Sequence, residues 1–153
     1  MKLRVIWIGK TRNKELLKIT EDFLERVRHF IPVDVTELRD PKAGDDRRQL
    51  AEEEARLLGA LDSNDRVVVL DASGQSWTSP QLAAFVGKHL EGNPRRLTFV
   101  IGGYGGIGAK IKALAERQWS LSPLTFTHEM TRVIVVEQLY RALCILNNHP
   151  YSK

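Results

Sequence analysis

Short apolar runs that alternate with amphipathic helical stretches constrain this chain more than any other feature of its sequence. Continuous runs rich in β-branched residues, at 3–8, 66–70 and 97–101, have the length and composition of buried strands. Between them, apolar residues recur every three or four positions, as at 14–30 and 46–61, which indicates helices. This alternation predicts an α/β fold with a mainly parallel sheet that is covered by helices on both faces.

The remaining segments continue the same alternation to the end of the chain. Residues 33–38 and 118–121 are expected to be shorter strands, and further helices are expected at about 79–90, 109–117 and 128–147. Ser79 is expected to cap its helix with Pro80 at the first position. The segment Asp71–Gly74 is expected to be a turn after the third strand.

Length and composition bound the class of protein. The 153 residues, 42% hydrophobic and 27% charged, are typical of a single globular domain over 1–153. No apolar run is long enough to span a bilayer or to form a secretory signal, so we expect a cytoplasmic protein with no membrane partner. A single cysteine, Cys144, excludes an internal disulfide and a multi-cysteine zinc site, and no metal is expected. The net charge of +4 permits an RNA partner.

Glycine is concentrated in residues 102–108, which hold five of the eleven glycines between a strand and a helix. Gly103, Gly105 and Gly108 match G-x-G-x-x-G, but this follows the fourth strand and lacks an acidic residue at a strand end about twenty positions on. Gly108 is followed by Ala109-Lys110, so a Walker A loop is not present either. Because a tight turn needs fewer glycines, the excess predicts a ligand loop.

Two other segments follow strands at the same expected edge of the sheet. Open parallel sheets bind ligands outside the carboxyl ends of their strands. The run Leu121–Phe126 mixes apolar side chains with hydroxyls and a proline, and Asp71 follows the third strand. Taken alone, the first segment reads as a connector and the second as local turn chemistry.

The last predicted helix is apolar from Val133 to Leu146 except for Glu137, Gln138 and Arg141. A helix that is apolar on most of its surface must be covered on most sides. A partner subunit is a reasonable source of that cover, which predicts a homodimer. The tail beyond this helix carries a histidine, an aromatic ring, a hydroxyl and a cation, which suit contact with a nucleotide.

The sequence resembles a known family, the ribosomal RNA large-subunit methyltransferases H. These are pseudouridine N3-methyltransferases of 23S rRNA in the SPOUT or α/β-knot class. The resemblance runs essentially end to end, and its motifs are specific in order and spacing. It is densest at Val68–Asp71 with Gly74, Phe99–Gly103, Leu121–His128, Arg132–Ala142 and His149–Tyr151.

The resemblance implies a homodimer whose C-terminal segment is threaded into a trefoil knot, which no periodicity argument would predict. It implies S-adenosylmethionine as methyl donor, bound in a bent form by three loops. Carried onto this sequence, the cofactor contacts fall at Leu70, Gly102, Gly103, Leu121, Ser122, Pro123, Leu124, Thr125 and Phe126.

The implied reaction is methyl transfer to N3 of a pseudouridine in 23S rRNA within the assembled ribosome. For this reaction we expect Arg132 to stabilise negative charge on the base and Tyr151 to pack or hydrogen-bond near it, with His149 as a further catalytic candidate. Ser152 stands where the family tail commonly has a histidine, and His149 and His128 are the candidates to replace it. Two alternatives stay open: a non-catalytic ribosome-binding factor of the same fold, and a nucleotide- or dinucleotide-binding α/β protein.

Overall fold

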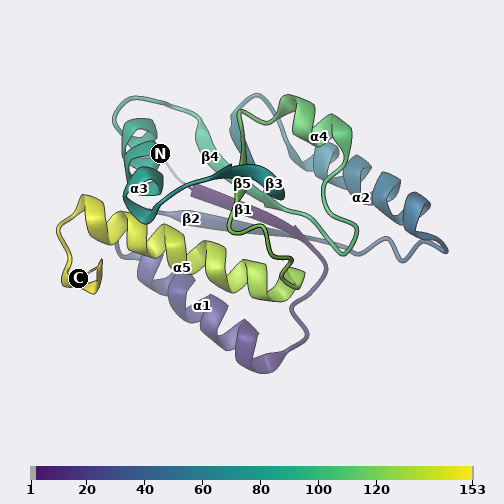
Figure 1. Cartoon of the computed structure of the whole chain (residues 1–153), viewed down its shortest axis with the longest axis horizontal. Helices are drawn as coiled ribbons and strands as arrows, with labels where there is room; N and C mark the ends of the chain where they lie inside the picture. The colour runs from purple at the N-terminus through teal and green to yellow at the C-terminus, as the bar shows by residue number, and fades with distance from the viewer. Residues whose placement is uncertain (1–2, 153) are drawn as a thin grey trace.

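The computed structural model describes residues 3–152 and shows five parallel strands in the order β2-β1-β4-β3-β5 (Figure 1). The predicted alternation of strands and helices is confirmed. The elements are β1 (Leu3–Ile8), α1 (Lys14–Arg28), β2 (Val33–Leu38), α2 (Asp46–Ala60), β3 (Asp65–Ser76), α3 (Ser79–Leu90), β4 (Arg96–Ile101), α4 (Ala109–Leu114), β5 (Arg117–Ser120), α5 (His128–Leu146) and the 3-10 turn η1 (Pro150–Ser152).

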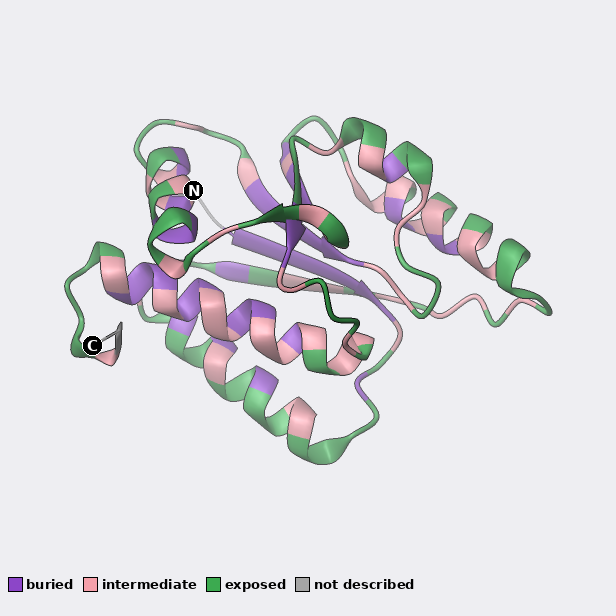
Figure 2. Ribbon diagram, in the orientation of Figure 1, coloured by how far each residue is buried: buried purple, intermediate pink, exposed green. Residues whose placement is uncertain are grey.

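Helices cover both faces of the sheet, and the buried side chains fall into two clusters accordingly (Figure 2). Because successive strand residues point to opposite faces, Val5 and Trp7 pack into the cluster under α1, α3 and α5. Ile6 and Ile8 pack into the cluster under α2 and α4. Burial on both faces explains why these strands read as continuous apolar runs.

The helices begin at polar residues whose side chains accept hydrogen bonds from the first turn. Asn13, Asp45 and Thr127 do so for α1, α2 and α5. The prediction that Ser79 caps α3 is wrong. Thr78 is the cap, in a reciprocal pair with Gln81, and the Ser79 hydroxyl instead donates to Gln138 on α5.

The predicted turn at Asp71–Gly74 is also wrong, because β3 continues through it to Ser76. The pairing of β3 with β5 changes register between Leu70 and Gln75, both of which oppose Trp119. At Gly74 the backbone approaches β5 so closely that an added Cβ would lie 2.4 Å from the carbonyl oxygen of Gln118. The turn chemistry of the sequence therefore marks an irregularity inside a long strand.

The last helix, α5, packs against α1 and α3 of its own chain, and these helices cover much of its apolar surface. Tyr140 on α5 contacts the rings of Phe23 and Phe30, with centroids 6.0 and 6.1 Å away. None of the helices in the described chain is long and apolar enough to cross a membrane.

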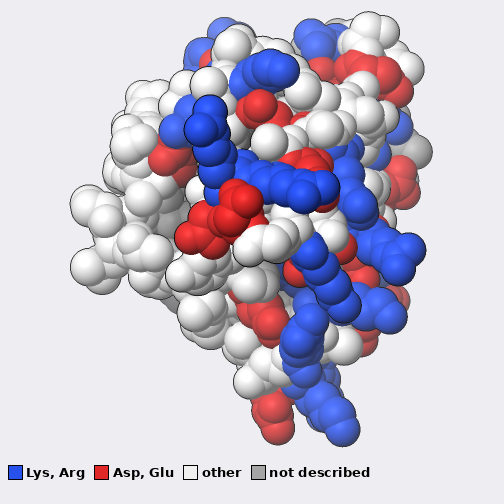
Figure 3. Space-filling view, turned by 90° about the vertical axis from the view of Figure 1, so that its right-hand side faces the viewer, with Lys and Arg blue, Asp and Glu red and all other residues white. Residues whose placement is uncertain are grey.

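Charged residues are distributed unevenly over the surface. Lys and Arg gather in a band on the end of the molecule where the strands have their carboxyl ends (Figure 3). The uncharged side chains beside this band belong to the part of the surface that faces the viewer in Figure 1.

Candidate functional site

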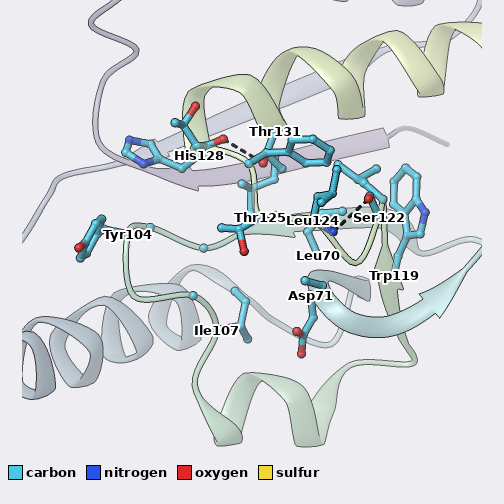
Figure 4. Close-up of a pocket in the computed structure, with 18 residues that line it drawn as sticks. Leu70, Asp71, Tyr104, Ile107, Trp119, Ser122, Leu124, Thr125, His128 and Thr131 are labelled. Carbon is cyan, nitrogen blue, oxygen red and sulfur yellow. Dashed lines mark hydrogen bonds between the residues drawn. The ribbon is translucent and has the colours of Figure 1, made fainter.

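A cavity of about 580 Å³ lies at the carboxyl ends of β4 and β5 and beside the register shift of β3, the strand between them. These strands contribute Ile101, Trp119 and Leu70, and the residues that follow them form most of the remaining wall (Figure 4). The three segments identified in the sequence thus come together at one site. This is the position expected for a ligand in an open parallel sheet.

Most of the residues expected to bind the cofactor line this cavity. Those that do are Leu70, Gly102, Gly103, Leu121, Ser122, Leu124, Thr125 and Phe126, whereas Pro123 is exposed and is not part of the wall. Sequence reasoning did not assign Trp119, Ile107 or Thr131 to the site, although all three line it. The sequence did offer a clue to Trp119, because an aromatic residue in the strand just before the predicted cofactor loop is well placed to line the site.

The loop after β5 is fixed by hydroxyl groups. The buried Ser120 hydroxyl lies 3.0 Å from the carbonyl oxygens of both Ala72 and Ser122, which ties the loop to β3. The Ser122 hydroxyl then accepts a hydrogen bond from the backbone N–H of Leu124 at 3.1 Å. These bonds shape the wall in the absence of any ligand contact.

The glycine-rich loop lies against α2, and this contact accounts for two of its five glycines. A Cβ on Gly103 would lie 2.6 Å from Oε2 of Glu53, and a Cβ on Gly108 would lie 2.0 Å from Oε2 of Glu54. Gly106 adopts a positive φ of 84° and donates to the Gly103 carbonyl. Part of the glycine excess is therefore explained by helix packing and a tight turn rather than by ligand approach.

Glu54 also occupies the start of α4. Its Oε2 accepts hydrogen bonds from the backbone N–H groups of Lys110 and Ile111 at 3.0 and 3.4 Å. Those N–H groups would bind phosphate in a dinucleotide-binding loop. Because a carboxylate of the chain itself already fills this position, the glycine loop is not arranged to hold a pyrophosphate.

Asp71 is the one carboxylate among the described wall residues. Its Oδ2 pairs with Lys112 at 2.9 Å and its Oδ1 accepts from the backbone and hydroxyl of Ser73. Burial alone would raise the pKa of Asp71, but these hydrogen bonds outweigh it and the pKa lies below its usual value. Asp71 is therefore ionised at neutral pH.

His128 is the first residue of α5 and lines another part of the cavity than Asp71 does. Figure 4 shows its ring on the side of the site where Tyr104 lies. Burial, and then the positive charge of Arg132, lower the pKa of His128 below 6.5. The imidazole is therefore neutral at pH 7 and has the protonation state of a proton acceptor.

The structure does not bring Arg132 to the cavity wall. Its side chain is fully buried and donates to the backbone oxygen of Ile8 at 2.6 Å and to the hydroxyl of Thr11 at 2.9 Å. The guanidinium also lies over the Trp7 ring, 5.0 Å from its centroid. Its Nε has no hydrogen-bond partner among the described residues. In this chain, Arg132 joins the start of α5 to the end of β1.

The two tail residues lie at the far end of α5 from the cavity. A helix of 19 residues is about 28 Å long. Tyr151 packs against Tyr140, and its hydroxyl donates to Glu137 at 2.8 Å. His149 forms edge contacts with Phe30 and Tyr140. Within one chain, neither residue meets the residues of the cavity. The side chain of Ser152 lies outside the part of the structure that is described.

The described residues contain no group of three His, Cys, Asp or Glu side chains placed to hold a metal ion.

Comparison with known proteins identifies the family. A family model described as "Predicted SPOUT methyltransferase" matches residues 1–152. The chain belongs to this family.

Relatives of this SPOUT methyltransferase are named "Ribosomal RNA large subunit methyltransferase H". The protein from Geobacter metallireducens is 40% identical over 99% of this chain and 98% of its own length. The proteins from Trichlorobacter lovleyi and Geotalea daltonii are 39% and 38% identical over 99% of both chains.

A solved structure also matches this SPOUT methyltransferase. It is the SpoU methyltransferase AviRb from Streptomyces viridochromogenes in complex with AdoMet, with a TM-score of 0.48 and 11% sequence identity. The match covers 92% of this chain and 57% of that one.

Proposed function

We propose that this SPOUT methyltransferase transfers a methyl group from S-adenosylmethionine to N3 of a pseudouridine in 23S rRNA, on the assembled ribosome. The named relatives of nearly the same length support ribosomal RNA as the substrate. The resemblance noted in the sequence supports the pseudouridine and its N3 atom.

The observation that carries the proposal is the chemistry of the cavity wall. Its volume of about 580 Å³ is in the range of small-molecule sites. Among the described wall residues there is one carboxylate, Asp71, and no lysine or arginine. Such a wall suits a ligand with a large apolar surface, and it disfavours a pyrophosphate because it offers no cation and its one carboxylate is already paired with Lys112. We assign the hydroxyls of Ser122 and Thr125 and the backbone of Gly102, which line the cavity, to orient polar groups of the donor.

S-adenosylmethionine supplies an activated methyl group, so the main task of the chain is to position the donor and the target base in line. N3 must lose its proton during the transfer. His128 lines the cavity in neutral form and is the residue we assign to accept that proton. Arg132 acts through His128: its charge adds to the larger effect of burial in lowering the pKa of the imidazole, and its hydrogen bonds fix the start of α5.

The tail requires a second copy of the chain if it takes part in the reaction. Tyr151 and His149 lie about one helix length from the cavity of their own chain. In a homodimer, we infer that the tail, still packed on its own α5 through Tyr140 and Glu137, lies beside the cavity of the partner protomer. We assign Tyr151 and His149 to that composite site, where Tyr151 packs beside the target base.

The test is methyl transfer from labelled S-adenosylmethionine to bacterial ribosomes that lack the modification, followed by mass analysis of the labelled nucleoside. The proposal requires label in N3-methylpseudouridine of 23S rRNA. Label in another nucleoside would show that the enzyme methylates a different target and would contradict the proposed substrate. Cofactor binding without transfer would indicate a ribosome-binding factor that lacks the activity.

A further inference from the structure

Three exposed cations surround the end of the molecule at which the cavity opens. Lys10 and Arg12 follow β1 and Lys42 follows β2, so all three lie at the carboxyl edge of the sheet. Figure 3 shows a band of Lys and Arg side chains on this end of the molecule. None of the three side chains forms an ion pair or side-chain hydrogen bond with another described residue. These three residues are called the basic rim below.

The backbone of Arg12, one member of the basic rim, is tied to α5 beside the wall of the cavity. Oε1 of Glu129 accepts hydrogen bonds from the N–H groups of Arg12 and Asn13 at 3.1 and 2.9 Å. Glu129 is the neighbour of His128, which lines the cavity. The position of Arg12 is therefore fixed relative to the site.

Lys42 is held by a separate contact, between the loop after β2 and α2. Its N–H donates to Oδ1 of Asp40 at 3.0 Å, and Gln49 donates to that oxygen at 2.8 Å. The hydrogen bonds from Gln49 and Lys42 lower the pKa of Asp40, and the charges of Lys42 and Arg12 add to them. Lys42 and Arg12 thus both lie near Asp40, although they follow different strands.

Tyr104 is the second, independent feature of this edge. It stands at the tip of the glycine-rich loop, lines the cavity, and has 86% of its surface exposed (Figure 4). A large aromatic side chain in this position gains nothing from the core of its own chain. Unpaired bases of RNA are commonly held by stacking on such a ring.

We propose that Tyr104 and the basic rim form the RNA-contact surface of this methyltransferase: Tyr104 stacks on an unpaired nucleobase beside the target, and Lys10, Arg12 and Lys42 contact phosphates. The inference rests on the proposed function and adds the residues that recognise the substrate. Charge and shape select the partner, because exposed cations attract phosphates and an exposed aromatic ring can stack on a base.

At the opposite, amino edge of the sheet, basic residues form ion pairs with neighbouring acids. Arg66 pairs with Glu116 there, and Arg96 pairs with Asp65 and Asp62. Their charges are largely balanced by neighbouring acids. The contrast makes this amino edge a suitable place for control substitutions.

The test compares two triple variants that each remove three positive charges. The rim variant is Lys10→Gln/Arg12→Gln/Lys42→Gln, and the control is Arg28→Gln/Lys88→Gln/Arg117→Gln, at residues on the amino edge. Co-sedimentation with unmodified bacterial ribosomes measures binding at several salt concentrations. The rim variant is expected to bind about tenfold more weakly or worse, with a shallower salt dependence, because each lost phosphate contact reduces the slope by about 0.7–0.9. Calorimetry should show unchanged affinity for S-adenosylmethionine.

Binding within twofold of wild type, or an equal loss in the control variant, would overturn the assignment of the rim. The outcome does not depend on turnover, because methyl transfer by the wild-type protein is measured separately and tests the proposed function alone. A loss that is independent of salt would point to a ribosomal protein as the partner and would also contradict the proposal.

Tyr104 is tested by a pair of variants. Tyr104→Ala is expected to weaken ribosome binding about tenfold, in the range that alanine substitution costs a stacked base. Tyr104→Phe keeps the ring and should bind within twofold of wild type. Equal binding by Tyr104→Ala and wild type would remove the stacking role.

Discussion

The carboxylate of Glu53 fills the space that a side chain at Gly103 would need. Oε2 of Glu53 would lie 2.6 Å from a Cβ at that position. Glu53 is itself only 3% exposed and accepts a hydrogen bond from Gln49 at 2.8 Å. The wall of the cavity is therefore built directly on α2, and its shape depends on a buried acid that lies outside the wall.

Substitution of Gly103 by alanine should push the loop away from α2. We expect Gly103→Ala to lower the free energy of unfolding by about 1–3 kcal/mol, as overpacking does in a filled site. Affinity for S-adenosylmethionine should fall as well. Urea unfolding and calorimetry measure the two effects.

Gly105→Ala is the matched control for this substitution. A Cβ at Gly105 would meet only Leu50, at an ordinary distance of 3.7 Å, so that variant should resemble wild type. Adding Glu53→Ala to Gly103→Ala should recover part of the loss, because the two residues are in contact. Additive losses in the double variant would mean that the contact is not the cause.

Glu53 should also give the stability of the fold a specific pH dependence. Burial raises the pKa of Glu53 above 4.5, and the hydrogen bond from Gln49 only partly opposes this; the carboxylate of Asp40 adds to the rise. A raised pKa means that the folded state binds the proton more tightly than the unfolded state. The stabilisation is complete below about pH 4.5 and is lost as the pH rises through the raised pKa.

Glu53→Gln stays neutral and keeps the amide partner of Gln49. We expect the variant to gain stability relative to wild type as the pH increases from 4.5 to 7.5. Thermal or urea unfolding of both proteins across this range measures the difference. A constant difference, or one that shrinks with pH, would show that Glu53 ionises normally in the fold.

The Ser120 hydroxyl should be important for the cofactor loop. Ser120→Ala removes the link to Ala72 and Ser122, which we expect to cost about 1 kcal/mol of stability. The affinity for S-adenosylmethionine should drop severalfold because the loop loses its fixed shape. Ser76→Ala, at the exposed end of β3, serves as the control. If calorimetric titration finds equal affinities for S-adenosylmethionine in all three proteins, the Ser120 hydroxyl does not contribute to cofactor binding.

Arg132 should influence His128 and the fold together. Arg132→Met keeps much of the volume but leaves the oxygens of Ile8 and Thr11 without their partner, at a cost of about 1–3 kcal/mol. Without the guanidinium charge, the pKa of His128 should move up toward 6.5. Urea unfolding and an NMR titration of His128 measure both changes, with the exposed Arg28→Met as the control. An unchanged pKa of His128 would leave Arg132 with a structural role only.

The sequence predicts the layers of the fold well because burial leaves a local pattern. The runs that became β1 and β4 are mostly apolar, since both of their faces are covered. The same reasoning places Leu70, Gly102 and Ser122 at one edge, because parallel strands share their carboxyl edge. The knot and the homodimer stay predictions from the resemblance.

What the sequence did not indicate depends on contacts between distant residues. Arg132 is one helical turn from His128, but its partner Ile8 is 124 residues away, so its burial left no local signal. The glycines at 103 and 108 suggested a ligand loop, whereas the helix beneath them carries the glutamates that exclude a side chain. Only the packing of α2 against the loop distinguishes these two explanations.

The central claim is that the cavity at the ends of β4, β3 and β5 binds S-adenosylmethionine. An NMR titration of the protein with this cofactor tests it most directly, with the backbone N–H signals of Leu70, Gly102 and Leu124 as reporters. The account predicts saturable binding of one molecule per chain, with the largest shifts at these three positions. The absence of binding, or shifts centred elsewhere in the fold, would contradict it.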